Sequence, residues 1–359
     1  MVGKMKMIIK ACIIILLLIG LCFLGYYKYQ EYQYRQSPEY KLLQKGYTKQ
    51  QVQIILDKGT EKQIETIISL DYNPQIPQIM NHKDYKSDYF KRYLNYQGPK
   101  NIDDLILLVN QDIDQTSIPY SDDLLTFVKT PYFIKENLSR YLDYKNKYPD
   151  LSYQEIIKRV NCGIDAEFYT NVKTADTNKG NLILINKYYQ LDASYTPNDL
   201  QAIDDDNHYL TKEAALHFSQ MISEASKVGY YYEVNSAYRS YSDQEEIYQE
   251  YKNNYGNTYA ENYAAHPGHS EHQSGLAVDM VAQDPKGRDF EQTEEYAWLQ
   301  EHAHEYGFIM RYTKENQYIT GYNYESWHYR YVGVEAAKQI KQEGLSFEEY
   351  YHYYIEKGQ

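Results

Sequence analysis

The sequence has little cysteine and tryptophan, and it lacks a basic cluster beyond its N-terminus. Three cysteines occur in 359 residues. Cys12 and Cys22 fall within an apolar N-terminal run, which leaves Cys162 alone in the remainder. A lone cysteine cannot build an intrachain disulfide framework, so we interpret Cys162 as a structural thiol. The net charge of −13, without a Lys/Arg cluster, argues against nucleic acid as a partner, because such binding depends on neutralising phosphates.

Tyrosine, in contrast, is abundant. The chain has 45 tyrosines against 9 phenylalanines and 2 tryptophans. We interpret most of them as amphipathic replacements for Phe and Leu in the core and at the surface. Stacking on a sugar or a peptide is a second role for some, but composition does not identify which ones. The length itself predicts two soluble domains.

The N-terminus predicts a membrane anchor. Three lysines precede residues 11–27, a run without charge, and the apolar stretch reaches bilayer-spanning length when residues 7–9 are included. A cleaved signal peptide needs a small-x-small site, but the exit from this run is bulky and aromatic. A lipoprotein cysteine at Cys22 is disfavoured by the large Leu21 before it. We therefore predict a cytoplasmic tail and transmembrane helix at residues 1–27, a single pass through the cell membrane, and an extracytoplasmic remainder.

Residues 28–175 are predicted to be mainly helical. Capping-box patterns begin at Thr48 and Ser152, each followed by an amphipathic stretch. A weak internal repeat is present, in which an Arg-Tyr-Leu-x-Tyr segment precedes a Val-Asn-x-x-Ile-Asp segment. It occurs at 92–96 with 109–114, and again at 140–144 with 160–165. Packing of repeated helical units explains this pattern, and a role in wall binding or substrate presentation is the alternative.

Residues 176–359 are predicted to form an α+β domain, because short strands and helices alternate there. Strands are expected at 182–185, 230–235, 275–281 and 308–312. Helices are expected to open at Thr211, to be capped by Ser242-x-x-Glu245, and to run from about 293 to 306 with Gly307 as the stop signal.

Two polar clusters in this domain contain candidate metal-binding and catalytic residues. In the first, the predicted strand places Asp279 on one face with the small Ala277, and His272 can turn back toward it. A buried Asp at the end of an apolar strand needs a partner or a metal. In the second cluster, His328 shares a strand face with Arg330.

Two histidines and one aspartate make a three-ligand set that leaves zinc a fourth position for water, as catalytic sites do. The chemistry then needs a base, and Glu325, three residues before His328, is the candidate. A fixed cation is also needed where negative charge develops on the scissile carbonyl. Arg239, which leaves a strand just before a predicted helix, fits that role.

Taken together, three motifs resemble one family. They are Ser-x-His-x-x-Gly-x-Ala-x-Asp (270–279), Glu-x-x-His (325–328) and Tyr-Arg-Ser (238–240), all within about 90 residues. This pattern resembles the VanY-like metallo-D-alanyl-D-alanine carboxypeptidases, which include L,D-carboxypeptidase relatives. The resemblance covers about residues 180–345. It implies a zinc D,D-peptidase-type catalytic domain with a small antiparallel sheet flanked by helices.

The resemblance also implies residue roles. His272, Asp279 and His328 would bind one Zn²⁺, Glu325 would be the general base, and Arg239 would contact the scissile carbonyl. Substrate-binding roles are implied for Ser270, Gln244 and Ser240. The sequence departs from the family at His266, where Arg is frequent, and at His269, where Tyr is common. These departures concern the rim of the site and therefore substrate preference.

The predicted function is removal of the C-terminal D-Ala from peptidoglycan stem peptides by attack of a metal-bound water. An L,D-carboxypeptidase acting on tetrapeptide stems needs the same groups, so it remains an alternative. A wall endopeptidase and a non-catalytic wall-binding protein are further alternatives. The second of these is disfavoured because all three ligands, Glu325 and Arg239 are present.

Overall fold

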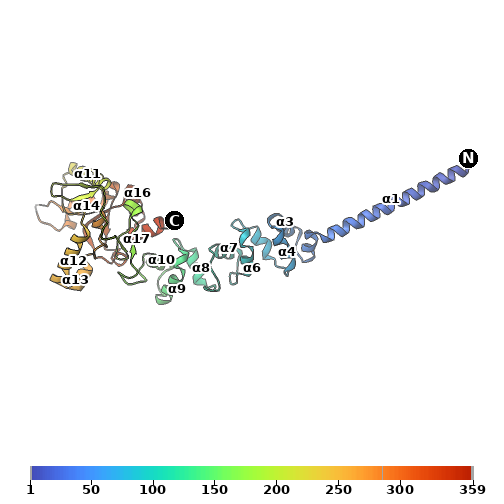
Figure 1. Cartoon of the computed structure of the whole chain (residues 1–359), viewed down its shortest axis with the longest axis horizontal. Helices are drawn as coiled ribbons and strands as arrows, with labels where there is room; N and C mark the ends of the chain where they lie inside the picture. The colour runs from blue at the N-terminus through green and yellow to red at the C-terminus, as the bar shows by residue number, and fades with distance from the viewer. Residues whose placement is uncertain (1, 285, 357–359) are drawn as a thin grey trace. The chain divides into compact units, whose positions relative to one another are not determined.

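The computed structural model describes residues 2–284 and 286–356, and the chain divides into two compact units. The first unit ends at Lys129 and the second begins at Thr130. The domain boundary predicted between residues 175 and 176 is a separate matter from this division into compact units, and it stays a prediction. The elements of the first unit are helices (Figure 1): α1 (Val2–Gln36), α2 (Pro38–Gln44), α3 (Lys49–Lys58), α4 (Glu61–Ser69), α5 (Gln75–Met80), η1 (Ser87–Tyr89), α6 (Phe90–Asn95), α7 (Ile102–Asn110) and α8 (Asp122–Lys129).

Helix α1 contains the apolar N-terminal run and continues to Gln36. Among the described residues, it is the one helix long and apolar enough to cross a membrane, and none of its residues is buried. Such a helix fits a single-pass anchor or a signal sequence.

The predicted capping box at Thr48 is confirmed. The Thr48 hydroxyl accepts a hydrogen bond from the backbone of Gln51, whose side chain accepts one from the Thr48 backbone. This exchange satisfies two amide groups that a helix N-terminus leaves unpaired.

The second unit is α+β, as predicted. Its first part holds η2 (Lys135–Asn137), α9 (Leu138–Lys147), α10 (Tyr153–Asn161), β1 (Lys173–Thr174), η3 (Thr177–Leu182), β2 (Tyr189–Gln190), β3 (Leu200–Ala202), β4 (Tyr209–Thr211) and α11 (Lys212–Lys227). It continues with β5 (Tyr232–Ser236), α12 (Tyr241–Tyr255), α13 (Asn257–Tyr263), η4 (Glu271–Ser274), β6 (Ala277–Ala282), η5 (Phe290–Gln292), α14 (Glu294–His302) and η6 (Ala303–Tyr306). The last elements are β7 (Phe308–Tyr312), α15 (Gln317–Thr320), β8 (Glu325–Tyr331), α16 (Val334–Glu343), α17 (Phe347–Tyr350) and η7 (Tyr351–Ile355).

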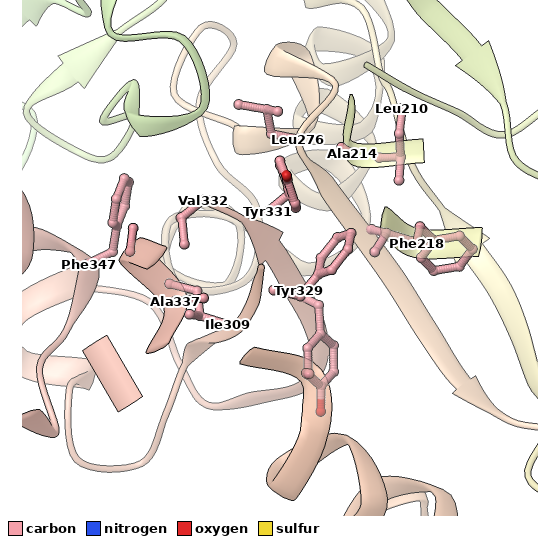
Figure 2. Close-up of a cluster of buried hydrophobic side chains, with 14 of the residues drawn as sticks. Leu210, Ala214, Phe218, Leu276, Ile309, Tyr329, Tyr331, Val332, Ala337 and Phe347 are labelled. Carbon is pink, nitrogen blue, oxygen red and sulfur yellow. The ribbon is translucent and has the colours of Figure 1, made fainter. Parts of the chain in front are cut away.

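The central sheet has the order β5-β6-β8-β7, and neighbouring strands are antiparallel. Side chains alternate between its two faces. One face is apolar: Tyr329 and Tyr331 of β8 join Val278 of β6 in a core with Phe218 of α11 and Ala337 of α16. Figure 2 shows the two tyrosines together with Phe218 and Ala337. Burying a large apolar side chain contributes about 1.5–3 kcal/mol, so this face anchors the sheet and leaves the opposite face for polar groups.

Two local predictions are wrong. The apolar run at 182–185 is not a strand: η3 ends at Leu182, and the buried residues that follow have no ladder partner. A side chain supplies a hydrogen bond there in place of a neighbouring strand: Arg330 Nη2 donates to the carbonyl of Ile183 at 2.8 Å. Helix α12 is capped by Ser240, not Ser242, because Asp243 supplies the reciprocal acceptor of the capping box.

The internal repeat corresponds to a repeated hydrogen-bond pattern. In the first unit, the Tyr93 hydroxyl donates to Asn110 Oδ1 at 2.7 Å. In the second unit, the Tyr141 hydroxyl donates to Asn161 Oδ1. In both, the Asn amide donates to a backbone carbonyl, that of Asp84 or of Tyr132. The repeat therefore encodes a packing unit in which an asparagine, half-buried at Asn110 and buried at Asn161, connects two helices to a loop.

Candidate active site

The polar face of the sheet brings the three predicted ligands together. Asp279 of β6 lies directly opposite His328 of β8 in the strand register, and His272 comes from η4 just before β6. His328 Nδ1 lies 2.9 Å from Asp279 Oδ1, and His272 Nε2 lies 3.2 Å from Asp279 Oδ2. One ligand atom from each residue falls within 4.8 Å of the others. The cross-strand pairing thus unites residues that are 49 positions apart.

Both histidines are held through the nitrogen that faces away from this cluster. His272 Nδ1 lies 2.6 Å from the carbonyl oxygen of Ala237, just after β5. His328 Nε2 lies 3.3 Å from Glu271 Oε2. Such contacts fix the tautomer and orientation of a histidine that binds metal. Two imidazoles and one carboxylate, so held, fit zinc with an open fourth position.

Glu271 is a residue whose role sequence reasoning missed. Its carboxylate is fully buried and accepts hydrogen bonds from Arg311 Nε at 2.9 Å and from Arg330 Nη1 at 2.8 Å. Burial disfavours its charge, but these two guanidinium groups hold the pKa of Glu271 well below its usual range. Arg311 also pairs with the buried Glu348 of α17. A buried charge network therefore lies behind His328.

Glu325 lies at the start of β8, with Oε2 3.8 Å from His328 Nδ1. Burial raises the pKa of Glu325 to about 7, and the nearby Asp279 carboxylate adds to this increase, while the His328 charge opposes it. A carboxyl group with this pKa is suited to take and return a proton near neutral pH.

Arg239 follows β5 and is held from two sides. Its Nη1 donates to Gln244 Oε1 at 2.7 Å, and its Nη2 donates to Ser236 Oγ at 3.0 Å. Gln244, buried in the first turns of α12, donates in turn to the carbonyl of Ala265 at 2.8 Å. Both ends of the Gln244 amide are therefore occupied, and this residue orients the guanidinium group.

A cavity of about 410 Å³ connects these groups. The predicted residues that line it are His272, Asp279, His328, Glu325, Arg239, Gln244 and Ser270. Aromatic side chains, among them Tyr312 and Trp327, complete the wall. The remaining predicted residue, Ser240, caps α12 and is not part of the lining.

His266 and His269 pack outside the lining of the cavity. His269 is buried, with Nδ1 2.7 Å from the carbonyl oxygen of Asn186. His266 stacks on Tyr169 at 3.8 Å between ring centroids, and its Nε2 lies 2.8 Å from a Glu261 carboxylate oxygen. Both therefore support the loop before η4.

Comparison with known proteins gives consistent matches to one family. A family model described as VanY, D-alanyl-D-alanine carboxypeptidase, matches residues 207–334, a range that includes all the predicted site residues. The chain is 37% identical to YodJ of Bacillus subtilis (strain 168) over 208 residues, which cover 52% of this chain and 75% of YodJ. It is 34% identical to a D-alanyl-D-alanine carboxypeptidase of Enterococcus faecium over 192 residues, 50% of this chain and 60% of that protein. A solved structure of the LdcB LD-carboxypeptidase is 38% identical, with 51% of this chain and 90% of that one covered and a TM-score of 0.47.

Proposed function

This chain belongs to the VanY D-alanyl-D-alanine carboxypeptidase family, and from that membership we propose that it is a zinc enzyme that removes the C-terminal D-Ala from peptidoglycan stem peptides. The observation that carries the proposal is the grouping of His272, Asp279 and His328 beside Glu325, a partly buried glutamate with a raised pKa. Family membership supports a carboxypeptidase, and the donor set of two histidines and one aspartate supports metal dependence.

One Zn²⁺ would be held by His272 Nε2, by Asp279 and by His328 Nδ1, the atoms that face one another in the cluster. When bound, the ion supplies a Lewis acid and makes water a stronger nucleophile at neutral pH. Proton transfer and the stabilisation of negative charge are assigned to residues of the chain.

Glu325 would accept the proton of the attacking water and return it to the leaving amine, so that the C–N bond breaks and D-alanine departs with a neutral amino group. Its raised pKa favours both transfers near pH 7. Arg239, oriented by Gln244 and Ser236, supplies a fixed positive charge where the carbonyl oxygen becomes negative.

We assign the terminal carboxylate of the substrate to the part of the cavity near Ser270. This side chain is buried and lines the cavity next to His272. Ser240 retains its predicted substrate-binding role only through the resemblance, since its hydroxyl caps α12 and lies 2.9 Å from that of Ser242.

The enzyme would act at the outer face of the cell membrane, anchored by α1. The apolar part of α1 and the lysines before it support a single pass with the N-terminus inside. In the sequence, helices α2 to α8 come after α1 and before the second unit.

The test is product analysis by mass spectrometry with the full chain in detergent and added zinc. Pentapeptide and tetrapeptide stems are offered in separate reactions. The proposal predicts the loss of one D-Ala from the pentapeptide and an intact tetrapeptide, with no loss in Glu325→Ala.

Other outcomes contradict the proposal in distinct ways. Trimming of the tetrapeptide establishes an L,D-carboxypeptidase. Cleavage within the stem or its bridge establishes an endopeptidase. Zinc binding without any cleavage overturns the carboxypeptidase proposal and favours a non-catalytic wall-binding protein.

A further inference from the structure

Four tyrosines form a continuous aromatic row on the helix pair α12–α13. Tyr251 and Tyr255 lie one helical turn apart on α12, and Tyr259 and Tyr263 lie one turn apart on α13. The two helices lie side by side (Figure 1). Ring centroids are 4.7 Å apart for Tyr255 and Tyr259, and 4.4 Å apart for Tyr259 and Tyr263. Tyr251 lies 6.0 Å from both Tyr255 and Tyr259. We call these four residues the tyrosine ladder.

The turn between the helices builds this row. Gly256 separates α12 from α13 with φ 86° and ψ 166°, a conformation open essentially to glycine alone. The helical conformation is therefore interrupted at this residue, and tyrosines of the two helices come into ring contact.

The ladder is exposed and begins at the active-site cavity. Tyr251 and Tyr263 line the cavity, whereas Tyr255 and Tyr259 do not. The exposed fractions are 63% for Tyr255, 39% for Tyr259 and 50% for Tyr263. Ring–ring contact stabilises the helix pair, but burial would serve that purpose better. A contiguous exposed aromatic patch that opens into a catalytic cavity is typical of a binding surface.

We propose that the tyrosine ladder binds sugar rings of the glycan strand to which the stem peptide is attached. The inference rests on the proposed function, because that function places a stem peptide in the cavity. A pyranose ring has an apolar C–H face and a hydroxylated edge, and tyrosine has an apolar ring face and a hydroxyl tip. An exposed row of tyrosines therefore matches a chain of amino sugars in both respects.

Distance along the helix supports this occupant. Gln244, which holds Arg239 at the scissile bond, lies eleven residues before Tyr255 on α12, or about 16 Å along the axis. The four residues between the sugar and the scissile bond of a pentapeptide stem span up to about 14 Å when extended. A substrate with its last residue at Arg239 would thus present its sugar beside Tyr255, the most exposed tyrosine of the ladder.

The test compares two substrates with the full chain in detergent: a free pentapeptide stem, and the same pentapeptide carried on its disaccharide. The wild type is expected to have a lower KM for the glycan-bearing substrate, by about tenfold, the effect of one or two aromatic anchors at an interface. In the double variant Tyr255→Ala/Tyr259→Ala this KM ratio is expected to fall to about one.

Two matched variants separate stacking from folding. Tyr255→Phe/Tyr259→Phe keeps the ring faces, so it should retain most of the wild-type ratio. Tyr231→Ala removes another exposed tyrosine, 55% exposed, at the end of β5 away from the cavity, and should leave the ratio unchanged. Equal KM values for the two substrates in the wild type would overturn the inference while leaving the proposed function intact. Absence of cleavage of both substrates by the wild type would instead remove the proposed function itself.

A binding measurement does not depend on catalysis. Calorimetric titration of Glu325→Ala with a β-1,4-linked N-acetylglucosamine tetramer should give heat of binding that is lost when Tyr255→Ala/Tyr259→Ala is added. Absence of binding by Glu325→Ala, or binding that survives the loss of both tyrosines, would overturn the inference.

Discussion

His328 Nε2 lies 3.3 Å from Oε2 of Glu271, while Nδ1 of the same ring lies 2.9 Å from Asp279. The imidazole is thus held between two carboxylates, one on each side. The Asp279 side is the proposed metal site, and the Glu271 side is a buried charge network. Because Arg311 and Arg330 fix the Glu271 carboxylate, the network fixes the ring that would bind zinc.

Glu271→Gln should weaken zinc binding by about 10–100-fold, because a neutral amide orients and polarises the His328 ring less well. The measurement is competition against a chelator of known affinity. The matched control is Glu348→Gln, which also removes a buried carboxylate from Arg311 but does not contact His328.

Both substitutions should lower the free energy of unfolding by several kcal/mol, on the order of the 3–5 kcal/mol cost of breaking a buried ion pair. Zinc affinity should change in Glu271→Gln alone. An equal loss of affinity in the two variants would mean that Glu271 acts only through stability.

Zinc affinity should depend on pH through His328. In the metal-free protein, burial disfavours the imidazolium, but hydrogen bonds to Asp279 and Glu271 outweigh burial and raise the pKa of His328 to about 9. Burial lowers the pKa of His272, so that ring is neutral near pH 7. His328 is therefore protonated at pH 7 and must lose a proton to bind metal.

The expected result is a zinc affinity that rises by about tenfold per pH unit below pH 9, as displacement of one proton requires. Chelator competition between pH 6.5 and 8.5, or calorimetry in buffers of different ionisation enthalpy, measures it. Affinity that is independent of pH in this range would show that His328 is already neutral.

Arg239→Ala should lower kcat for the pentapeptide by about 10²–10³-fold, the cost of losing one group that stabilises an oxyanion. Gln244→Ala should lower kcat less, because Arg239 retains its contact with Ser236. Steady-state kinetics of release of D-alanine measure both effects. A Gln244→Ala variant with an unchanged kcat and a raised KM would indicate that Gln244 binds substrate directly, as the family resemblance implied.

The asparagines of the internal repeat, Asn110 in the first unit and Asn161 in the second, should each stabilise the unit in which they lie. Asn110→Ala removes the partner of Tyr93, and Asn161→Ala removes the partner of Tyr141, each at a cost of about 1–3 kcal/mol for an unpaired buried group. Hydrogen exchange followed by mass spectrometry should show faster exchange in α6 and α7 for the first variant, and in α9 and α10 for the second. Faster exchange across both units in either variant would contradict independent packing of the two repeats.

Part of the site could be predicted because two of the proposed ligands, Asp279 and His328, lie on one face of the sheet. Alternation placed Asp279 and Ala277 together and His328 with Arg330, and the sheet then paired Asp279 with His328. Strand β7 matched its predicted bounds because Phe308–Tyr312, apolar except for Arg311, follows a glycine stop signal.

The parts that sequence reasoning missed depend on distant partners. Glu271 stands next to His272 in the motif, but its role depends on Arg311, Arg330 and Glu348, which are 40 to 77 positions later. The run at 182–185 resembles a strand locally, but the carbonyl of Ile183 accepts a hydrogen bond from the Arg330 side chain and not from a neighbouring strand. The tyrosine ladder likewise required the contact between α12 and α13, which composition cannot reveal.

We infer that the three proposed metal ligands and the proposed base are separate parts of one hydrolytic site. Zinc content and kcat on the pentapeptide, measured together for the wild type, Glu325→Gln and His272→Ala, test this inference. We expect about one zinc per chain in the wild type and in Glu325→Gln, with kcat in the latter lower by about 10²–10⁴-fold, and loss of both zinc and activity in His272→Ala. A Glu325→Gln variant with the wild-type rate, or a His272→Ala variant that keeps its zinc, would contradict it.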